Sequence, residues 1–153
     1  MSYGDQPPYV ESTIIMTTVR VVAPFVLTLG LFVMFHGAES AGGGFQGGVV
    51  VGSVILMLAF AFGIEAVREW LNPKWMLGIV GLGVLTFAAV GLGSVALGGA
   101  FLEYGVYGPL DAVKYGIELV ELGIGAIVTG VVVGLFFLVA GGFTAEDGEE
   151  GSA

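Results

Sequence analysis

Cysteine is absent from this 153-residue chain, and charged residues make up only 11% of it. The absence of cysteine excludes disulfides, thiolate metal sites and cysteine nucleophiles. Basic residues are the rarest, with 4 Lys and Arg together against 13 Asp and Glu, so the formal net charge is −9. Ordinary soluble domains carry about 25% charged residues. This shortage of charge excludes an ordinary soluble domain and indicates a membrane protein.

Long apolar runs fill most of the chain, whose mean hydropathy is +0.99. Four of these runs are close to the roughly 20 residues that an α-helix needs to cross a bilayer. The alternation over about ten residues that is typical of membrane β-strands is missing. The sequence therefore predicts an all-α integral membrane protein with short loops and four transmembrane helices, at about 13–36, 45–69, 75–97 and 112–140. Residues 1–12 are expected to form a polar tail, and residues 141–153 an acidic disordered tail.

A glycine-rich stretch joins the first two apolar segments. It contains Gly42, Gly43, Gly44, Phe45, Gly47 and Gly48. Glycines four residues apart lie on one face of a helix, where a second helix can approach backbone to backbone. One interpretation is a turn followed by a closely packed helix start. The other is a helix N-terminus whose free N–H groups hold an anion or a water chain.

Charged side chains near the start of the fourth segment are functional candidates. Lys114, Glu118 and Glu121 are spaced i, i+4 and i+7, so they share one helix face. Gly125 and Thr129 continue this face. An ionisable group inside a membrane usually faces the protein interior, water or a partner, so both glutamates are candidates for a proton or cation path. The alternative is that they lie hydrated at the membrane surface, favoured by the helix dipole.

The single histidine, His36, precedes the glycine-rich stretch. Histidine titrates near neutral pH, so His36 is a third candidate for the ion path. The alternative is a histidine at the membrane surface that bonds the turn backbone. Glu39, close by, is expected to be solvated. No cofactor, metal site or catalytic residue is predicted, because no second ligand stands at metal-binding spacing and no Ser-His-Asp set is recognisable.

The connections between the segments carry their own signals. Trp70 and Trp75 flank the short second connection, as is typical of a membrane surface. The third connection, over 98–114, contains glycine and proline and is expected to lack helix, with Asp111 as the N-cap of the fourth helix.

Basic residues predict the orientation. Arg20, Arg68 and Lys74 lie toward one membrane surface and Lys114 toward the other. Because basic residues are enriched on the cytoplasmic side, both termini are expected in the cytoplasm. Glu65 stands three residues before Arg68 and is expected to pair with it.

The run His36–Gly48, HGAESAGGGFQGG, resembles the G-H-x-x-P-G-G-G-F-x-G-G signature of the MnhB-type subunit of Mrp- or Mnh-type multisubunit Na⁺/H⁺ antiporters. Arg20 and Pro24 in the first segment, and the acid and glycine run that begins at Glu121, are also similar to this family. Related subunits occur in membrane-bound hydrogenases. The resemblance covers residues 13–137, in the family's order of four helices.

Two positions depart from the signature. Ala38 stands where the family usually has histidine, and Ala41 where it usually has proline. The first departure removes a family histidine from any proton path unless His36 replaces it. The second should loosen the turn without changing the fold.

The resemblance implies a non-enzymatic subunit of a Na⁺/H⁺ antiporter in the cell membrane, which helps to build the complex and is a candidate for lining the cation or proton path. Its implied partners are the other antiporter subunits, the lipid bilayer, and Na⁺ and H⁺ as transported ions; nucleic acid is not expected. The alternative is a purely structural subunit of a related redox complex, such as a membrane-bound hydrogenase. A stand-alone small multidrug exporter is disfavoured, because such proteins carry a carboxylate in the first helix and this chain has none there.

Overall fold

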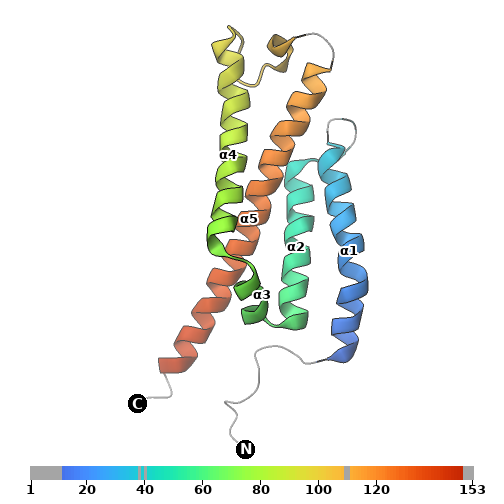
Figure 1. The fold of residues 1–153 in the computed structure, drawn as a ribbon, viewed down its shortest axis with the longest axis vertical. Coiled ribbons are helices and arrows are strands. Elements are labelled where there is room, and N and C mark those ends of the chain that lie inside the picture. The colour runs from blue at the N-terminus through green and yellow to red at the C-terminus, as the bar shows by residue number, and fades with distance from the viewer. Residues whose placement is uncertain (1–11, 38, 40, 109–110, 150–153) are drawn as a thin grey trace, which may run out of the picture.

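The computed structural model describes residues 12–37, 39, 41–108 and 111–149 (Figure 1). All regular structure in these residues is helical. It comprises α1 (Thr13–Phe35), α2 (Gly44–Phe62), α3 (Ile64–Trp70), α4 (Pro73–Ala96), the 3₁₀-helix η2 (Tyr104–Tyr107) and α5 (Ala112–Glu149). The chain runs up α1, down α2, up α4 and down α5. The start of α1, the end of α5 and α3 therefore lie toward one end of the molecule, opposite the glycine-rich turn and η2.

Four of the helices are long and apolar enough to cross a membrane. The spans are Thr13–Phe35, Gly44–Phe62, Lys74–Ala96 and Ala112–Ala140. A helix suits this environment because it hydrogen-bonds its own backbone groups where no water can. The prediction of an all-α integral membrane protein with four transmembrane helices is confirmed.

The start of α4 shows how local sequence sets a helix boundary. The side chain of Asn72 accepts a hydrogen bond from the backbone N–H of Lys74 at 2.9 Å, and Pro73 occupies the first turn. An Asn cap satisfies a free N–H group, and proline has no N–H to lose at that position. The short connection between α3 and α4 therefore has a defined geometry.

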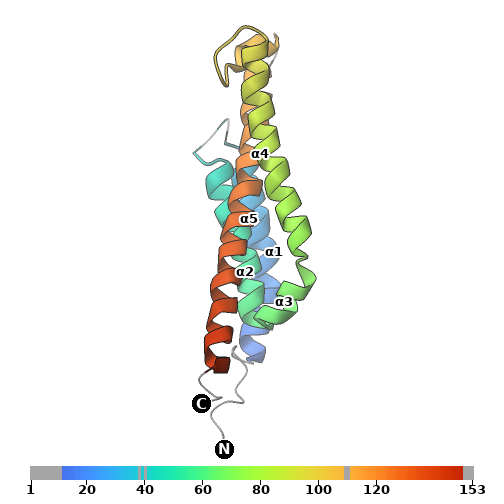
Figure 2. The same cartoon turned by 90° about the vertical axis from the view of Figure 1, so that its left-hand side faces the viewer.

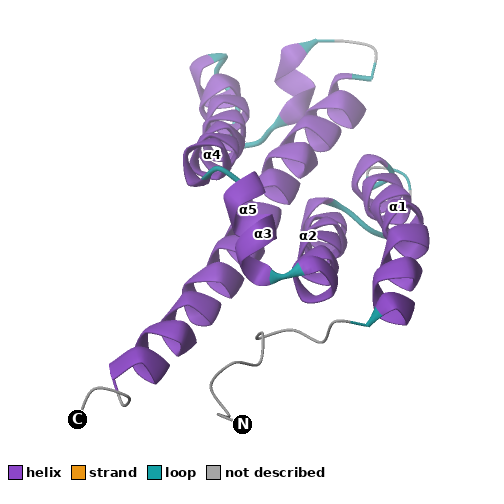
Figure 3. Ribbon diagram, turned by 60° about the horizontal axis from the view of Figure 1, so that its bottom comes forward, coloured by secondary structure: helices purple, strands orange, loops and turns teal. Residues whose placement is uncertain are grey.

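The helices form an open layer. α5 lies between α2 and α4, and α1 packs on the far side of α2 (Figures 1 and 3). Within the described residues, α4 contacts neither α1 nor α2. Seen from the side, the molecule is correspondingly thin (Figure 2). Both faces of the layer are therefore open to lipid or to other proteins.

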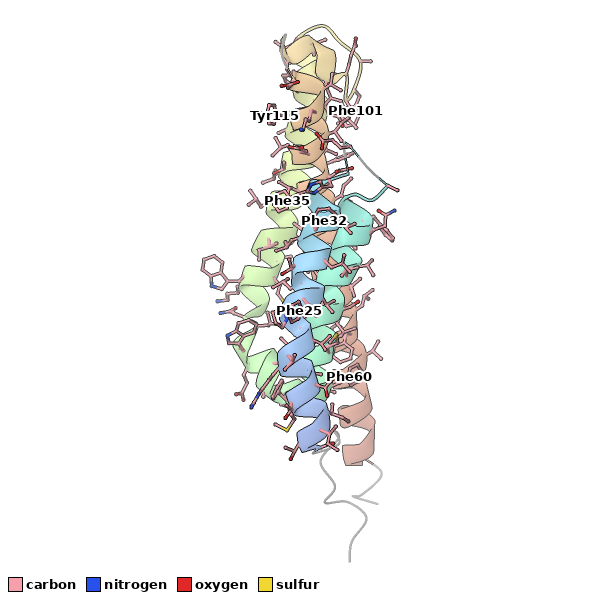
Figure 4. The ribbon with its side chains drawn as sticks, turned by 90° about the vertical axis from the view of Figure 1, so that its right-hand side faces the viewer. Phe25, Phe32, Phe35, Phe60, Phe101 and Tyr115 are labelled. Carbon is pink, nitrogen blue, oxygen red and sulfur yellow. The ribbon has the colours of Figure 1, made fainter. Side chains whose placement is uncertain are left out.

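Large apolar side chains cover these open faces. The six aromatic side chains labelled in Figure 4 are each at least 49% exposed, and they extend from Phe60 toward one end to Phe101 and Tyr115 near the other. Apolar surface this extensive is not typical of a protein that is alone in water. It suits hydrocarbon tails and neighbouring membrane subunits.

The helix expected over 45–69 is corrected to two helices. α2 ends at Phe62, Gly63 adopts a φ of 101°, and α3 begins at Ile64. Glycine adopts such a positive φ without the steric cost that a side chain brings. The N–H of Gly63 donates to the carbonyl of Ala59 at 3.0 Å, so the end of α2 remains bonded. The break lets α3 turn away from the axis of α2 (Figure 2).

Two other segments contain more helix than expected. The loop over 98–114 includes η2, where the N–H of Val106 donates to the carbonyl of Glu103 at 3.4 Å. A 3₁₀ turn needs only such i to i+3 bonds and is commonly used in short connectors. α5 continues to Glu149, through most of the segment 141–153 that was expected to be disordered. Extending an existing helix is easier than starting one. Residues 1–11 of the predicted N-terminal tail lie outside the described residues.

Two smaller predictions have different outcomes. Glu65 and Arg68 form the expected ion pair, 3.7 Å apart, with both side chains exposed. Asp111 directly precedes α5, and its carbonyl accepts a hydrogen bond from the N–H of Tyr115 at 2.9 Å. However, Asp111 has a φ of 57°, whereas an N-cap residue usually has extended backbone angles.

Candidate functional site

The turn between α1 and α2 brings the chain back against the end of α1. Gly43 is the N-cap of α2 and has a φ of 132°, which favours glycine. Its N–H donates to the carbonyl of Val33 at 3.2 Å. A Cβ on Gly42 would stand 3.1 Å from the side chain of Val33. The consecutive glycines therefore allow a tight return onto α1.

The next glycines let α2 contact α5 through the backbone. A Cβ on Gly44 would overlap the backbone carbonyl of Glu121, and a Cβ on Gly48 would lie 2.7 Å from the carbonyl oxygen of Gly125. The hydroxyl of Thr129 donates to the carbonyl of Gly48 at 2.9 Å. Small residues that admit such close contact, with a hydroxyl bond across the interface, are typical of packed membrane helices. The face that begins at Glu121 is thus the face of α5 that meets α2.

The other two residues predicted for the turn behave differently from each other. A Cβ on Gly47 would stand 2.7 Å from the Cβ of Met34, so Gly47 packs against α1 as Gly48 packs against α5. Phe45 lies between Gly44 and Gly47 in sequence but is 61% exposed. The glycines on both sides of Phe45 therefore hold the turn together, while its ring faces outward.

The carboxyl group of Glu121 lies against the glycine-rich turn. A Cβ on Gly37 would overlap both carboxyl oxygens, and a Cβ on Gly43 would stand 2.9 Å from Oε1. Oε2 is buried and has no hydrogen-bond partner in the part of the chain that the structure describes. A buried polar atom without a partner is costly. Such an atom is commonly found where a proton, an ion or water is handled.

Tyr104, from η2, extends this site toward the loop before α5. A Cβ on Gly116 would overlap the ring of Tyr104, so the tyrosine packs directly on the first turns of α5. Burial, and then the charge of Glu121, raise the pKa of the Tyr104 phenol above its ordinary value. No sequence signal connects these two residues, because Tyr104 has the features of a membrane-surface aromatic and stands 17 positions from Glu121.

An ion pair fastens the turn to α5 from outside. The ammonium group of Lys114 donates a hydrogen bond to Oε1 of Glu39, and both side chains are about half exposed. The hydrogen bond and the charge of Lys114 lower the pKa of Glu39. Glu39 was expected to be solvated; it is exposed, but it is paired. Glu118, between Lys114 and Glu121 on the same face of α5, is half-buried.

His36 lies at the end of α1, where the turn begins. Its Nδ1 lies 3.0 Å from the carbonyl oxygen of Phe32, and its ring stacks on that of Phe32 with centroids 4.1 Å apart. This contact joins His36 to the last turn of α1. The candidate site therefore centres on Glu121, with His36 at its edge.

Comparison with known proteins gives the family of this chain. Residues 14–144 match the family described as a domain related to the MnhB subunit of a Na⁺/H⁺ antiporter. The chain belongs to this MnhB family. It is 31% identical over 139 residues to the putative antiporter protein mnhB2 of Staphylococcus haemolyticus, which covers 86% of this chain and 97% of that protein. It is 30% identical over 138 residues to the mnhB2 protein of Staphylococcus aureus MRSA252, with the same coverage.

A third MnhB-family relative is the B-type subunit of the Na⁺/H⁺ antiporter of Bacillus subtilis. It is 31% identical over 91 residues, or 60% of this chain and 63% of that protein. These matches confirm the resemblance noted from the glycine-rich signature, and none of these names favours the hydrogenase alternative. The MnhB-family chain is a multi-pass membrane protein and a transporter component whose partners are other subunits.

The carboxyl group of Glu121 and the glycines around it could hold a proton or a cation. A carboxyl group with a free buried oxygen can hold a proton or a cation, according to its surroundings. Backbone glycines around it allow close approach of an ion or water because no side chain fills the space. The ion pair of Lys114 with Glu39 lies outside this carboxyl group and fixes the turn on which the group rests.

Proposed function

We propose that this MnhB-family chain is the B-type subunit of a multisubunit Na⁺/H⁺ antiporter in the cell membrane, and that Glu121 takes part in moving H⁺ or Na⁺. The observation that carries the second part is the buried Oε2 of Glu121, which has no partner among the described residues and lies beside Gly37. A permanently charged carboxylate without a partner would be costly at membrane depth. Glu121 therefore binds a proton or a cation as part of its function.

Glu118 and His36 are secondary members of the same path. Glu118 is on the same face of α5, one turn before Glu121, and is half-buried. His36 lies at the start of the turn that Glu121 contacts. Both residues would exchange ions between Glu121 and the surface or a neighbouring subunit.

The test is Na⁺-dependent proton exchange in vesicles that carry the complete complex. Glu121→Gln keeps the size of the side chain but removes its charge and its proton site, so we expect exchange to collapse. Assembly is checked on native gels. Glu69→Gln is the matched control, because Glu69 is also acidic but is exposed and lies in α3, at the other end of the molecule from the glycine-rich turn. Normal exchange by an intact Glu121→Gln complex would refute the role of Glu121.

A purely structural role is the second candidate, and the glycine contacts favour it. Gly44 and Gly48 place the backbones of α2 and α5 so close together that any side chain displaces one helix. A structural subunit predicts near-normal exchange in Glu121→Gln but failed assembly in Gly48→Leu. If Gly48→Leu fails to assemble and Glu121→Gln also loses exchange while assembled, both roles are present.

We also propose that both termini face the cytoplasm. Arg68 in α3 and Lys74 at the start of α4 lie toward the same end of the molecule as the start of α1 and the end of α5, and cytoplasmic ends of membrane proteins are enriched in basic residues. The chain has no cysteine, so a thiol reagent would label only a single cysteine introduced by mutation. Asn72→Cys should react with an impermeant thiol reagent only from the cytoplasmic side. Gly105→Cys, at a position with open space, should react only from the other side.

A further inference from the structure

A groove lies between α4 and α5 at the end of the molecule opposite the glycine-rich turn. It is a cavity of about 390 Å³, within the range of about 300–1,000 Å³ that holds small organic ligands. Apart from Arg68, its lining consists of aliphatic, methionine and phenylalanine side chains and two glycines, Gly130 and Gly134. Such a lining suits a hydrocarbon chain.

The glycines on α5 show why the groove is open. A Cβ on Gly130 would overlap the side chain of Val80, so α4 and α5 touch at that level. One turn further along α5, a Cβ on Gly134 would have no atom within 4 Å. Space therefore opens beside α5 between these two levels. α3 lies toward this end of the molecule (Figure 1).

Arg68 supplies a positive charge to this otherwise apolar groove. Its guanidinium group is half exposed and is paired with Glu65 at 3.7 Å. An exposed pair of that length contributes little, so the guanidinium group remains available to a stronger anion. Arginine binds phosphate through two parallel hydrogen bonds. Trp70 and Trp75, both exposed, flank the same connection and are typical of the headgroup level of a bilayer.

We propose that this groove binds an anionic glycerophospholipid, with one acyl chain between α4 and α5 and its phosphate at Arg68. Charge complementarity selects this occupant, because basic pockets between membrane helices are the usual sites of anionic headgroups. A transmembrane helix from another subunit would have to bring an acid to Arg68, so it is the competing occupant. This proposal does not depend on the role of Glu121.

The first experiment measures co-purified lipid. The complex that contains the full chain is extracted in mild detergent, washed, and its phospholipids are quantified by mass spectrometry. Gly134→Leu should fill the groove without a clash, and we expect a several-fold loss of retained anionic lipid. Gly78→Leu is the matched control, because Gly78 also has open space but does not line the groove. Arg68→Gln should reduce the preference for anionic over zwitterionic lipid.

A photocrosslinking side chain in place of Leu138, which lines the groove, identifies the occupant directly. An adduct with an anionic phospholipid that disappears in Gly134→Leu supports the proposal. An adduct with another subunit overturns it, because a protein then covers the groove. Equal lipid retention by the wild type, Gly134→Leu and Arg68→Gln also overturns it.

Discussion

Glycines line both flanks of α5, but the neighbouring helix packs more closely at the glycines of one flank than at those of the other. Toward α2, Gly44 and Gly48 stand so close to the backbone of α5 that neither position has room for a Cβ. Toward α4, Gly83 makes a similarly close contact, whereas a Cβ on Gly134, further along α5, would have no atom within 4 Å. The α2 flank is thus closed by backbone contact at Gly44 and Gly48, and the α4 flank is only partly closed.

The polar chemistry follows the closed flank. Glu121 and Thr129 both reach across it, the first onto Gly37 and the second to the carbonyl of Gly48. Where backbones are close, a polar side chain finds a backbone partner or a small enclosed space, and it is shielded from lipid. The open part of the α4 flank is instead an apolar groove with one arginine. Backbone proximity, rather than glycine content, therefore separates the two kinds of site.

One methyl group added on each flank of α5 tests whether the two flanks differ in packing. Gly44→Ala should destabilise the protein by about 1–3 kcal/mol or more, because the methyl group overlaps the carbonyl of Glu121 and α2 must move. Gly134→Ala, on the α4 flank, should be neutral or stabilising by up to about 1 kcal/mol, since alanine favours a helix where space is open. Unfolding by detergent titration, with assembly on native gels, measures both. Equal effects would mean that the two flanks do not differ.

The hydroxyl bond between α5 and α2 provides a smaller test. Thr129→Val removes the donor but keeps the shape, and we expect a loss of about 0.6–1.7 kcal/mol. Thr86→Val on α4 is the matched control, because its hydroxyl donates at 2.8 Å to the carbonyl of Leu82 in its own helix. We expect a smaller change there in the same titration. A larger effect at Thr86 would count against a special role for the α2 flank.

Tyr104 reports on the charge of Glu121 from the loop. Its pKa is raised first by burial and then by Glu121. In Glu121→Gln the second cause disappears, so the pKa of Tyr104 should fall but stay above its ordinary value. Absorbance titration measures this, with Tyr104→Phe subtracted to isolate the signal of one phenol. An unchanged pKa in Glu121→Gln would mean that Glu121 carries no charge that Tyr104 senses.

The sequence predicted the four spans and the small-residue faces because both depend on local periodicity and composition. The spacing of Lys114, Glu118 and Glu121 correctly placed them along α5, but it could not show that Lys114 pairs with Glu39. That pair joins residues 75 positions apart, and it forms only because α5 packs at a particular height along α2. The contact of Tyr104 with the start of α5 was also missed, because it too depends on tertiary packing and not on local sequence.

The break at Gly63 was missed for a different reason. The apolar run continues on both sides of it, and periodicity does not distinguish a continuous helix from two helices joined by one residue with positive φ. The signal was the glycine itself, followed within two residues by Glu65 where the charged end of the run begins. A glycine at that boundary can end a helix through its positive φ.

The smallest expected effect concerns the ion pair that fastens the turn to α5. The pKa of Glu39 is lowered by Lys114, so the pair is formed at neutral pH and stabilises the turn above the ordinary glutamate pKa of about 4.3. As pH falls through the lowered pKa, Glu39 is protonated and this contribution disappears. Amide hydrogen exchange of the turn, corrected for its intrinsic pH dependence, should therefore become faster at low pH. Lys114→Met should show the faster exchange already at neutral pH and no further step. If Lys114→Met exchanges like the wild type at neutral pH, the glycine contacts alone hold the turn, and the α2 flank is closed by backbone packing without help from charge.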